Sequence, residues 1–280
     1  MLSQFAAAFR TPDLRNKILF TLGLIAIYRM GAIIPTPGVD YTAIQTCLSL
    51  VEGNSLYGLI NLFSGGALLQ LSVFALGIMP YITASIIIQL LTVVIPRLEA
   101  LRKEGQSGQA KMTQYTRYLT IGLSVLQATA FVSLARTPGQ LFTGCNENLI
   151  PNQSIPLIIT MVITMTAGAA TLMWFGELIT DRGVGNGMSL LIFVSIIAGM
   201  PGQFWSIYQT RGTFILLLTL AVGVVIIAAV VYVEQAQRRI PVQYAKKMVG
   251  SRLMGGASTY IPLKVNMAGV IPVIFASSLL

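Results

Sequence analysis

The sequence predicts an all-α protein that crosses a membrane several times. Of its 280 residues, 55% are hydrophobic and only 10% are charged, whereas a soluble domain carries about 25% charged residues to cover its surface. The apolar runs reach about 20 residues, the length that crosses the hydrocarbon as a helix. They do not alternate between apolar and polar residues, which argues against the strands of a membrane barrel.

Six complete spans and the start of a seventh follow from these runs, which gives about six and a half. The predicted spans cover residues 18–36, 74–95, 115–135, 156–179, 188–207 and 213–233, and the last begins near Val265 and is still running at Leu280. We therefore expect the first part of a longer protein. Residues 1–17 do not resemble a cleaved signal, and we expect an amphipathic segment on the membrane surface there.

The Lys and Arg residues predict a cytoplasmic N-terminus. With this orientation, all but three of the 18 Lys and Arg residues fall on the cytoplasmic side, as the positive-inside rule requires. The exceptions are Arg136 and Arg211 outside and Arg29 within the first span. An arginine at the bilayer centre costs about 2.5–3.5 kcal/mol. Two interpretations of Arg29 stay open: the side chain extends outward to water, or it contacts a neighbouring helix or a partner subunit.

The cytoplasmic loop 234–264 is predicted to form a finger like a β-hairpin. The stretch "RRIPVQYAKK" alternates, "STYIPLKV" could pair with it, and the intervening "VGSRLMGG" is rich in turn residues. Pro241 and Pro262 require short or edge strands.

The two cysteines, Cys47 and Cys145, both fall on the predicted outer side, where a disulfide is permitted. Nothing in their spacing ties them together, so we expect two unpaired cysteines.

The composition disfavours most catalytic chemistry. The chain has no histidine, which removes Ser–His dyads and most metal sites. No carboxylate lies mid-span, because Glu177, Asp181 and Glu234 sit at inner ends of spans, so proton relays are not expected. The stretch "RGVGNG" at 182–187 follows a membrane helix rather than a strand, so a tight turn between helices is favoured over a phosphate loop. We expect no enzyme, no cofactor and no metal.

One uncharged stretch does not fit a plain spanning helix. Residues 64–91 are longer than one crossing needs, begin near Gly65 and Gly66, and contain Pro80. The weak first part suggests a separate short element or an ordinary re-entrant loop.

Several long stretches resemble the SecY family, whose members form the pore of the Sec protein-conducting channel. The resemblance runs in order along nearly the whole chain, and its stretches include "LFSGGALLQLSVFALGIMPYITASIIIQLLTVVIP", "LMWFGELITDRGVGNGMSLLIF" and "QRRIPVQYAKK". It implies a SecY-type helix bundle that translocates unfolded secretory proteins and inserts membrane proteins through a plugged pore with a lateral gate.

The resemblance also implies partners and a location. We expect a SecE-like subunit, a SecG-like subunit, a SecA-like motor and the ribosome, whose RNA would contact the cytoplasmic loop. Signal sequences, nascent chains and membrane lipids are further expected partners. The bacterial plasma membrane is the expected location, with the thylakoid membrane as the alternative.

The family's functional elements map onto four sets of residues in this sequence. The plug, a short helix closing the outer funnel, would be Leu56, Tyr57, Gly58, Leu59, Ile60, Asn61, Leu62, Phe63, Ser64, Gly65, Gly66, Ala67, Leu68, Leu69 and Gln70. The aliphatic pore ring would be Ile78, Ile82, Met188, Ile192 and Ile274. The lateral gate would use Thr83, Ser85, Gln89, Gln127, Asn266 and Gly269. Ribosome or motor docking would use Arg238, Arg239, Lys246 and Lys247.

Two other functions are compatible with part of the sequence. A secondary transporter with discontinuous helices would explain the glycine- and proline-broken span, but the lack of mid-span charge argues against it. A membrane scaffold would need no pore at all.

Overall fold

The computed structural model describes residues 11–50, 64–137, 147–243, 247–249, 252–254 and 258–266. The chain divides into two compact units, Met1–Gly202 and Gln203–Leu280. Each unit is described by itself.

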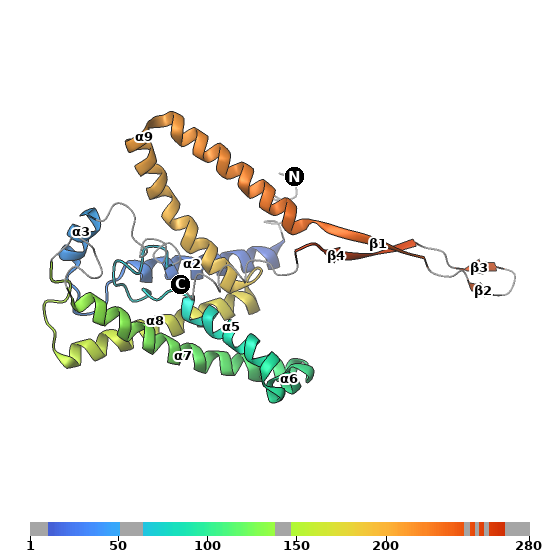
Figure 1. Cartoon of the computed structure of the whole chain (residues 1–280), viewed down its shortest axis with the longest axis horizontal. Coiled ribbons are helices and arrows are strands. Elements are labelled where there is room, and N and C mark those ends of the chain that lie inside the picture. Colours follow the sequence, from blue (N-terminus) through green and yellow to red (C-terminus); the bar gives the residue numbers. More distant parts are fainter. Residues whose placement is uncertain are drawn as a thin grey trace. The chain divides into compact units, whose positions relative to one another are not determined.

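The first unit is a bundle of helices (Figure 1). The helices are α2 (Pro12–Ile33), α3 (Tyr41–Leu50), α5 (Met79–Val94), α6 (Pro96–Lys103), α7 (Gln106–Arg136), α8 (Ile155–Arg182) and the first part of α9 (Gly187–Gln235). Among the described residues, α2, α7, α8 and α9 are each long and apolar enough to cross a membrane, and the bent pair α5–α6 would make a fifth span. The predicted all-α membrane bundle is therefore confirmed, while the number of spans stays a prediction.

The second predicted span begins later than expected, at Met79 rather than at residue 74. Residues 65–78 consist of successive turns with one bridge at Ser72. Pro80 occupies the first turn of α5, where its missing N–H costs no hydrogen bond. The proline thus marks the start of the helix rather than a kink inside it.

A sharp bend follows α5, and it creates a helix that we did not predict. Ile95 is extended, as expected for a residue before a proline, and α6 leaves at 101° to α5. The bend lies at the polar end of the span, since α6 carries Arg97, Arg102 and Lys103 and an ion pair between Glu99 and Lys103 at 2.7 Å.

The connection between α8 and α9 is the tight turn predicted for "RGVGNG". The Asn186 Oδ1 atom accepts the backbone N–H groups of Met188 at 3.0 Å and Ser189 at 3.3 Å and so caps α9. The two helices cross closely here, because a Cβ atom on Gly187 would lie 2.0 Å from the Gly176 carbonyl oxygen. This close approach fixes the position of Met188.

Helix α9 contains both the fifth and the sixth predicted spans. Its 49 residues would measure about 74 Å if straight, more than twice the thickness of the hydrocarbon. The backbone is non-helical at Gly212, with φ 79° and ψ 175°, so that two helices meet at a kink there. The break falls between the two predicted spans.

The second unit confirms the predicted finger. Strand β1 (Gln237–Gln243) pairs antiparallel with β4 (Ser258–Lys264), with Arg239 opposite Pro262 and Pro241 opposite Tyr260. Each of these strands has one neighbour, so the prolines lie on edge strands as expected. Beyond them, in the part predicted as turn-rich, β2 (Lys247–Val249) pairs with β3 (Arg252–Met254) (Figure 1).

One expectation about the cysteines is wrong. Cys47, in α3, is disulfide-bonded, whereas we expected two unpaired cysteines; Cys145 lies outside the described residues. Spacing along the sequence could not reveal this bond, which depends on how segments meet in space. Helix α3 is also fixed at its start, where hydrogen bonds from Thr42 and from the backbone N–H of Ala43 hold the pKa of Asp40 below its usual value.

Candidate functional site

The structure brings four of the five predicted ring residues into one hydrophobic cluster, which we call the ring cluster. Ile78 directly precedes α5 and Ile82 lies in its first turn, while Met188 and Ile192 lie one turn apart at the start of α9. Ile78 is 5% exposed, and the other three are half-buried. Ile274 lies outside the described residues. The predicted ring thus rests on two helix segments that are about 100 residues apart in sequence.

Aromatic and aliphatic residues of α2 and α8 support these four side chains. The Tyr28 and Phe74 rings are stacked with their centroids 6.0 Å apart. The buried members of the ring cluster are Leu24, Tyr28, Phe74, Ile78, Leu172, Phe175, Ile179 and Leu191. Aliphatic side chains offer ions no ligand and water no hydrogen bond, so a constriction made of them closes by dewetting.

The described part of the predicted plug is residues 64–70, of which Ser64 is helical and residues 65–70 form turns. Ser64, Ala67, Leu68 and Leu69 are buried. Gly65 and Gly66 have φ of 67° and 92°, values that glycine adopts without the steric cost of a side chain. Residues 56–63 lie outside the described residues.

A second hydrophobic cluster surrounds this segment, and we call it the plug cluster. Leu68 and Leu71 are 2% and 0% exposed and pack with residues of α3, α7 and α8. The members of the plug cluster are Ala43, Ile44, Cys47, Leu68, Leu69, Leu71, Ala75, Leu76, Ala128, Val132, Ala135, Leu149, Ile150, Met161, Met165 and Ala169.

Hydrogen bonds anchor the downstream end of the segment to the chain that follows α2. The Leu71 carbonyl oxygen accepts the Thr36 backbone N–H at 3.0 Å and the Thr36 hydroxyl at 2.8 Å. The Val73 N–H donates to the Ile34 carbonyl oxygen at 2.9 Å. Leu71 itself has φ of 46°, the one positive value at a described residue other than glycine. The chain therefore turns sharply at a firmly held point just after the predicted plug.

Arg29 contacts the predicted plug directly. Its Nη1 atom donates to the Gly65 carbonyl oxygen at 3.1 Å. The neighbouring Tyr28 hydroxyl bonds the Ser195 hydroxyl of α9 at 2.5 Å. The sequence left open an extension of Arg29 to water or a contact with a neighbouring helix or a partner subunit. The structure shows a contact, but its acceptor is a turn residue rather than a helix.

The predicted lateral-gate residues lie in different parts of the chain, so the gate stays a prediction. Ser85 and Gln89 lie four residues apart on one face of α5, and Gln127 lies on α7, which packs against α5. Thr83 lies on a different face of α5 and donates to the Met79 carbonyl oxygen of its own helix at 3.0 Å. Asn266 belongs to the second unit, and Gly269 lies outside the described residues.

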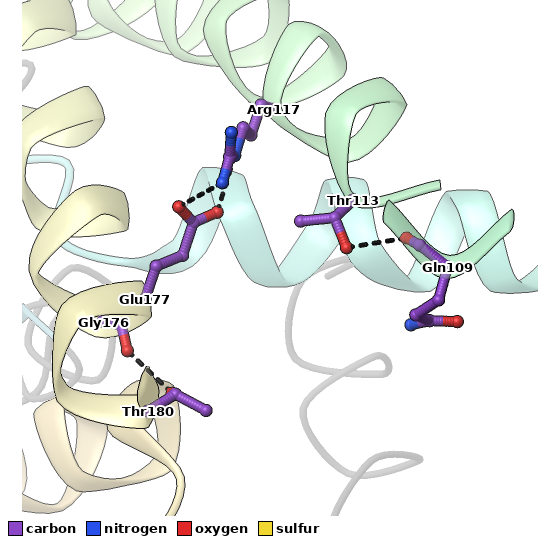
Figure 2. Close-up of polar contacts among 6 residues, drawn as sticks. All are labelled: Gln109, Thr113, Arg117, Gly176, Glu177 and Thr180. Atoms are coloured by element: carbon purple, nitrogen blue, oxygen red, sulfur yellow. Dashed lines mark hydrogen bonds and ion pairs between the residues drawn. The ribbon is translucent and has the colours of Figure 1, made fainter. Parts of the chain in front are cut away.

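The sequence did not reveal a polar cavity beside the ring cluster. Its central contact is a two-pronged ion pair, in which Arg117 Nε and Nη2 donate to the Glu177 carboxylate at 2.8 and 2.7 Å (Figure 2). The cavity measures about 280 Å³ and is lined by Tyr81, Thr113, Arg117, Glu177, Thr180, Asp181, Asn186 and Met188. The sequence placed Glu177 at the inner end of a span and Arg117 on the cytoplasmic side, but it could not pair residues 60 positions apart.

The cavity and the ring cluster share Met188, and Tyr81 contacts both. Thr113 and Thr180 donate to carbonyl oxygens of their own helices, those of Gln109 and Gly176 (Figure 2). A polar, water-accessible space thus borders the aliphatic ring, so the boundary between wet and dry surroundings lies at Met188.

The predicted docking residues are partly described. Arg238 and Arg239 are exposed on β1. The backbone of Lys247 lies in β2, and Lys246 lies outside the described residues.

Comparisons with known proteins agree on one family. A family model described as SecY matches residues 72–280. The chain is 65% identical over 287 residues to the protein translocase subunit SecY of Streptomyces scabiei and 62% identical over 283 residues to that of Mycobacterium tuberculosis. These matches cover all of this chain and 65% and 64% of the relatives. The chain therefore spans just under two thirds of the length of these relatives.

Three solved structures share the fold at low sequence identity. A protein-conducting channel superimposes with a TM-score of 0.60 at 19% identity, covering 94% of this chain and 56% of that one. Canine Sec61, from a ribosome–channel complex of the endoplasmic reticulum, gives 0.59 at 20% identity, with coverages of 94% and 56%. A SecY whose plug domain stabilises the closed state of the channel and maintains a membrane seal gives 0.58 at 21%, with coverages of 94% and 55%.

Proposed function

The chain belongs to the SecY family, and on that premise we propose that it is a protein-conducting channel subunit. It would translocate unfolded secretory proteins across a membrane and insert membrane proteins into the lipid. Its relatives in Streptomyces and Mycobacterium are named protein translocase subunits. Energy for transport would come from a SecA-like motor or the ribosome rather than from the subunit itself.

The observation that carries this proposal is the meeting of Ile78, Ile82, Met188 and Ile192 in one cluster. Their aliphatic side chains would close the resting channel by excluding water. They would also move aside for a passing polypeptide, because aliphatic side chains form no hydrogen bonds and the side chain of Met188 is flexible. A polar cavity next to Met188 supports a pore with a wet vestibule and a dry constriction.

The segment around residues 56–70 would be the plug. Residues 65–70 form turns that contain two glycines, and Leu68 and Leu69 are buried in the plug cluster. These turn residues have little regular secondary structure to lose on displacement. The similar SecY structure in which a plug domain stabilises the closed state supports this assignment.

The remaining assignments follow the family. A SecE-like subunit would clamp the bundle, and a SecG-like subunit would join it. The β1–β4 finger would dock the ribosome or the motor, consistent with the similar Sec61 from a ribosome–channel complex. Ser85, Gln89 and Gln127 would belong to the lateral gate for signal sequences. We propose the bacterial plasma membrane as the location, because the relatives are bacterial.

Removal of the plug tests the proposed function. We expect a full-length channel complex that lacks residues 56–70 to insert normally and to conduct ions in planar bilayers far more often than the parent. A second variant, with these residues replaced by a flexible Gly-Ser linker of equal length, should leak as well and controls for shortening of the chain. If both variants conduct no more than the parent, the plugged-channel proposal is wrong.

A further inference from the structure

The contact between Arg29 and Gly65 joins a spanning helix to the proposed plug. Arg29 lies one turn before the outer end of α2 and is half-buried. Its Nη1 atom is 3.1 Å from the Gly65 carbonyl oxygen. Within the described residues Arg29 forms no ion pair. A backbone carbonyl of the plug therefore serves as a hydrogen-bond acceptor for this guanidinium.

The packing at Gly65 makes this contact possible. A Cβ atom on Gly65 would lie 2.9 Å from Arg29 Nη1 and 3.2 Å from both the Cα atom and the carbonyl oxygen of Ser195. Ser195 belongs to α9 and is hydrogen-bonded to Tyr28 of α2. Gly65 thus lies where α2 and α9 approach each other, and a side chain at this position would press on the guanidinium and on the backbone of α9. Gly66, by contrast, has nothing within 4 Å of its Cβ position.

The plug is consequently held to the α2 region at two places of different kinds. At its downstream end, Leu71 and Val73 are bound through backbone hydrogen bonds to Thr36 and Ile34. Farther upstream, a single long side chain binds Gly65. Backbone pairing fixes the first place, whereas a side chain can change its rotamer and release the second.

We propose that Arg29 is a positioning residue that latches the plug in its closed place through the Gly65 carbonyl. This inference rests on the proposed function, because it requires residues 56–70 to be a plug. A charge-assisted hydrogen bond is about twice as strong as a neutral one, and low polarity around it strengthens it further. When the plug leaves, the guanidinium can turn to water at the nearby outer end of α2. The latch therefore opens without leaving a buried charge unsatisfied.

Resting conductance of the full-length channel complex in planar bilayers tests the latch. Arg29→Met keeps a long side chain but removes the hydrogen-bond donor. We expect it to raise the open probability roughly tenfold or more, because the closed state loses one hydrogen bond to a charged group. Arg29→Lys keeps a donor and should restore most of the closure. Met30→Ala, on an exposed neighbour, should behave like the parent.

The same substitution in a channel without residues 56–70 separates the latch from other roles of Arg29. If Arg29 acts through the plug, Arg29→Met adds no leak when the plug is already absent. A further increase in conductance from Arg29→Met in the plug-deleted channel would contradict the latch. So would an unchanged conductance of Arg29→Met in the intact channel, provided that the plug deletion itself conducts. In both cases the proposal of a plug would still hold. No conductance from the plug deletion itself would overturn the proposed function and the latch together.

A matched pair of glycine substitutions leaves Arg29 in place and so avoids any effect on membrane insertion. Gly65→Ala and Gly66→Ala impose similar backbone strain, because both residues have positive φ. Only the Gly65 methyl group would press on the Arg29 guanidinium and on Ser195. We expect Gly65→Ala to leak clearly more than Gly66→Ala. Equal leaks from the two variants would contradict the latch.

Discussion

At the scale of single residues, the aliphatic ring residues combine burial with an absence of polar atoms. Ile82 and Ile192 are half-buried in the ring cluster, one on α5 and one on α9. Neither side chain can form a hydrogen bond with water, so a constriction between them would stay dry as long as both remain aliphatic. A single polar group is therefore expected to change the constriction more than a change in size would.

Ile82→Asn and Ile192→Asn test this expectation. The amide offers water a hydrogen bond inside the constriction, so the closed state should lose stability. We expect precursors with defective signal sequences to be exported more readily by either variant of the full-length protein. Ile163→Asn introduces the same group on α8 at a side chain that is 61% exposed, and it should leave export of such precursors unchanged. Equal export by parent and ring variants would remove Ile82 and Ile192 from the ring.

Arg29 shows what a sequence can and cannot settle about one residue. Its place within an apolar span already marks it as unusual, because an isolated charge in lipid is costly. Its hydrogen-bond acceptor is a backbone carbonyl group 36 residues away. Every residue has such a group, so the sequence does not indicate which one Arg29 contacts. The sequence does not indicate the pairing of Arg117 with Glu177 across 60 residues either.

At the scale of elements, the β1–β4 finger carries the proposed docking charges. Successive residues of a strand point to opposite faces, so Arg238 and Arg239 present their charges on both sides of the two-stranded ribbon. The positive-inside rule explains the sign of these charges, but it does not require an ordered hairpin. An extended ribbon that bears arginine on each face is suited to contact with phosphates.

Changing Arg238 and Arg239 together to Glu should weaken ribosome binding and flatten its salt dependence. Each phosphate contact contributes about 0.9 to the salt slope, so the slope should fall by roughly one to two units. Co-sedimentation of the solubilised full-length complex with ribosomes across a salt series measures both effects. Arg136→Glu with Arg211→Glu changes the charge equally on the predicted outer side and should bind like the parent. If the finger variant binds ribosomes as tightly as the parent and with the same salt dependence, the docking proposal is wrong. The charges of the loop would then serve only to orient the protein in the membrane.

The elements that the sequence predicted best are those with a strong local signal. Long apolar runs predicted α7 and α8, and alternation with edge prolines predicted β1 and β4. The sequence missed α6, because a short charged helix resembles a polar loop in its composition. It placed the start of the second span five residues early, because the apolar residues 74–78 are buried by packing in turns rather than by a helix.

At the scale of the whole molecule, the first unit contains two hydrophobic clusters and a polar cavity at Met188. In the proposed channel, the ring cluster would be the dry constriction, the segment in the plug cluster would be a removable cover, and the cavity would be the water-filled approach. Hydropathy predicts the order of the spans but none of these features, because each feature is formed by residues that are distant in sequence and meet only in the folded chain. The family resemblance indicated the ring residues, and the structure brings four of them together.

The central claim is that a polypeptide passes between the ring residues of α5 and α9. Site-specific photocrosslinking to a translocation intermediate stalled in the full-length channel complex tests it most directly. We predict that a crosslinker at position 82 or 192 captures the stalled chain, whereas one at the exposed positions 163 or 94 captures lipid. Capture of the chain at positions 163 and 94 but not at positions 82 and 192 would contradict the account.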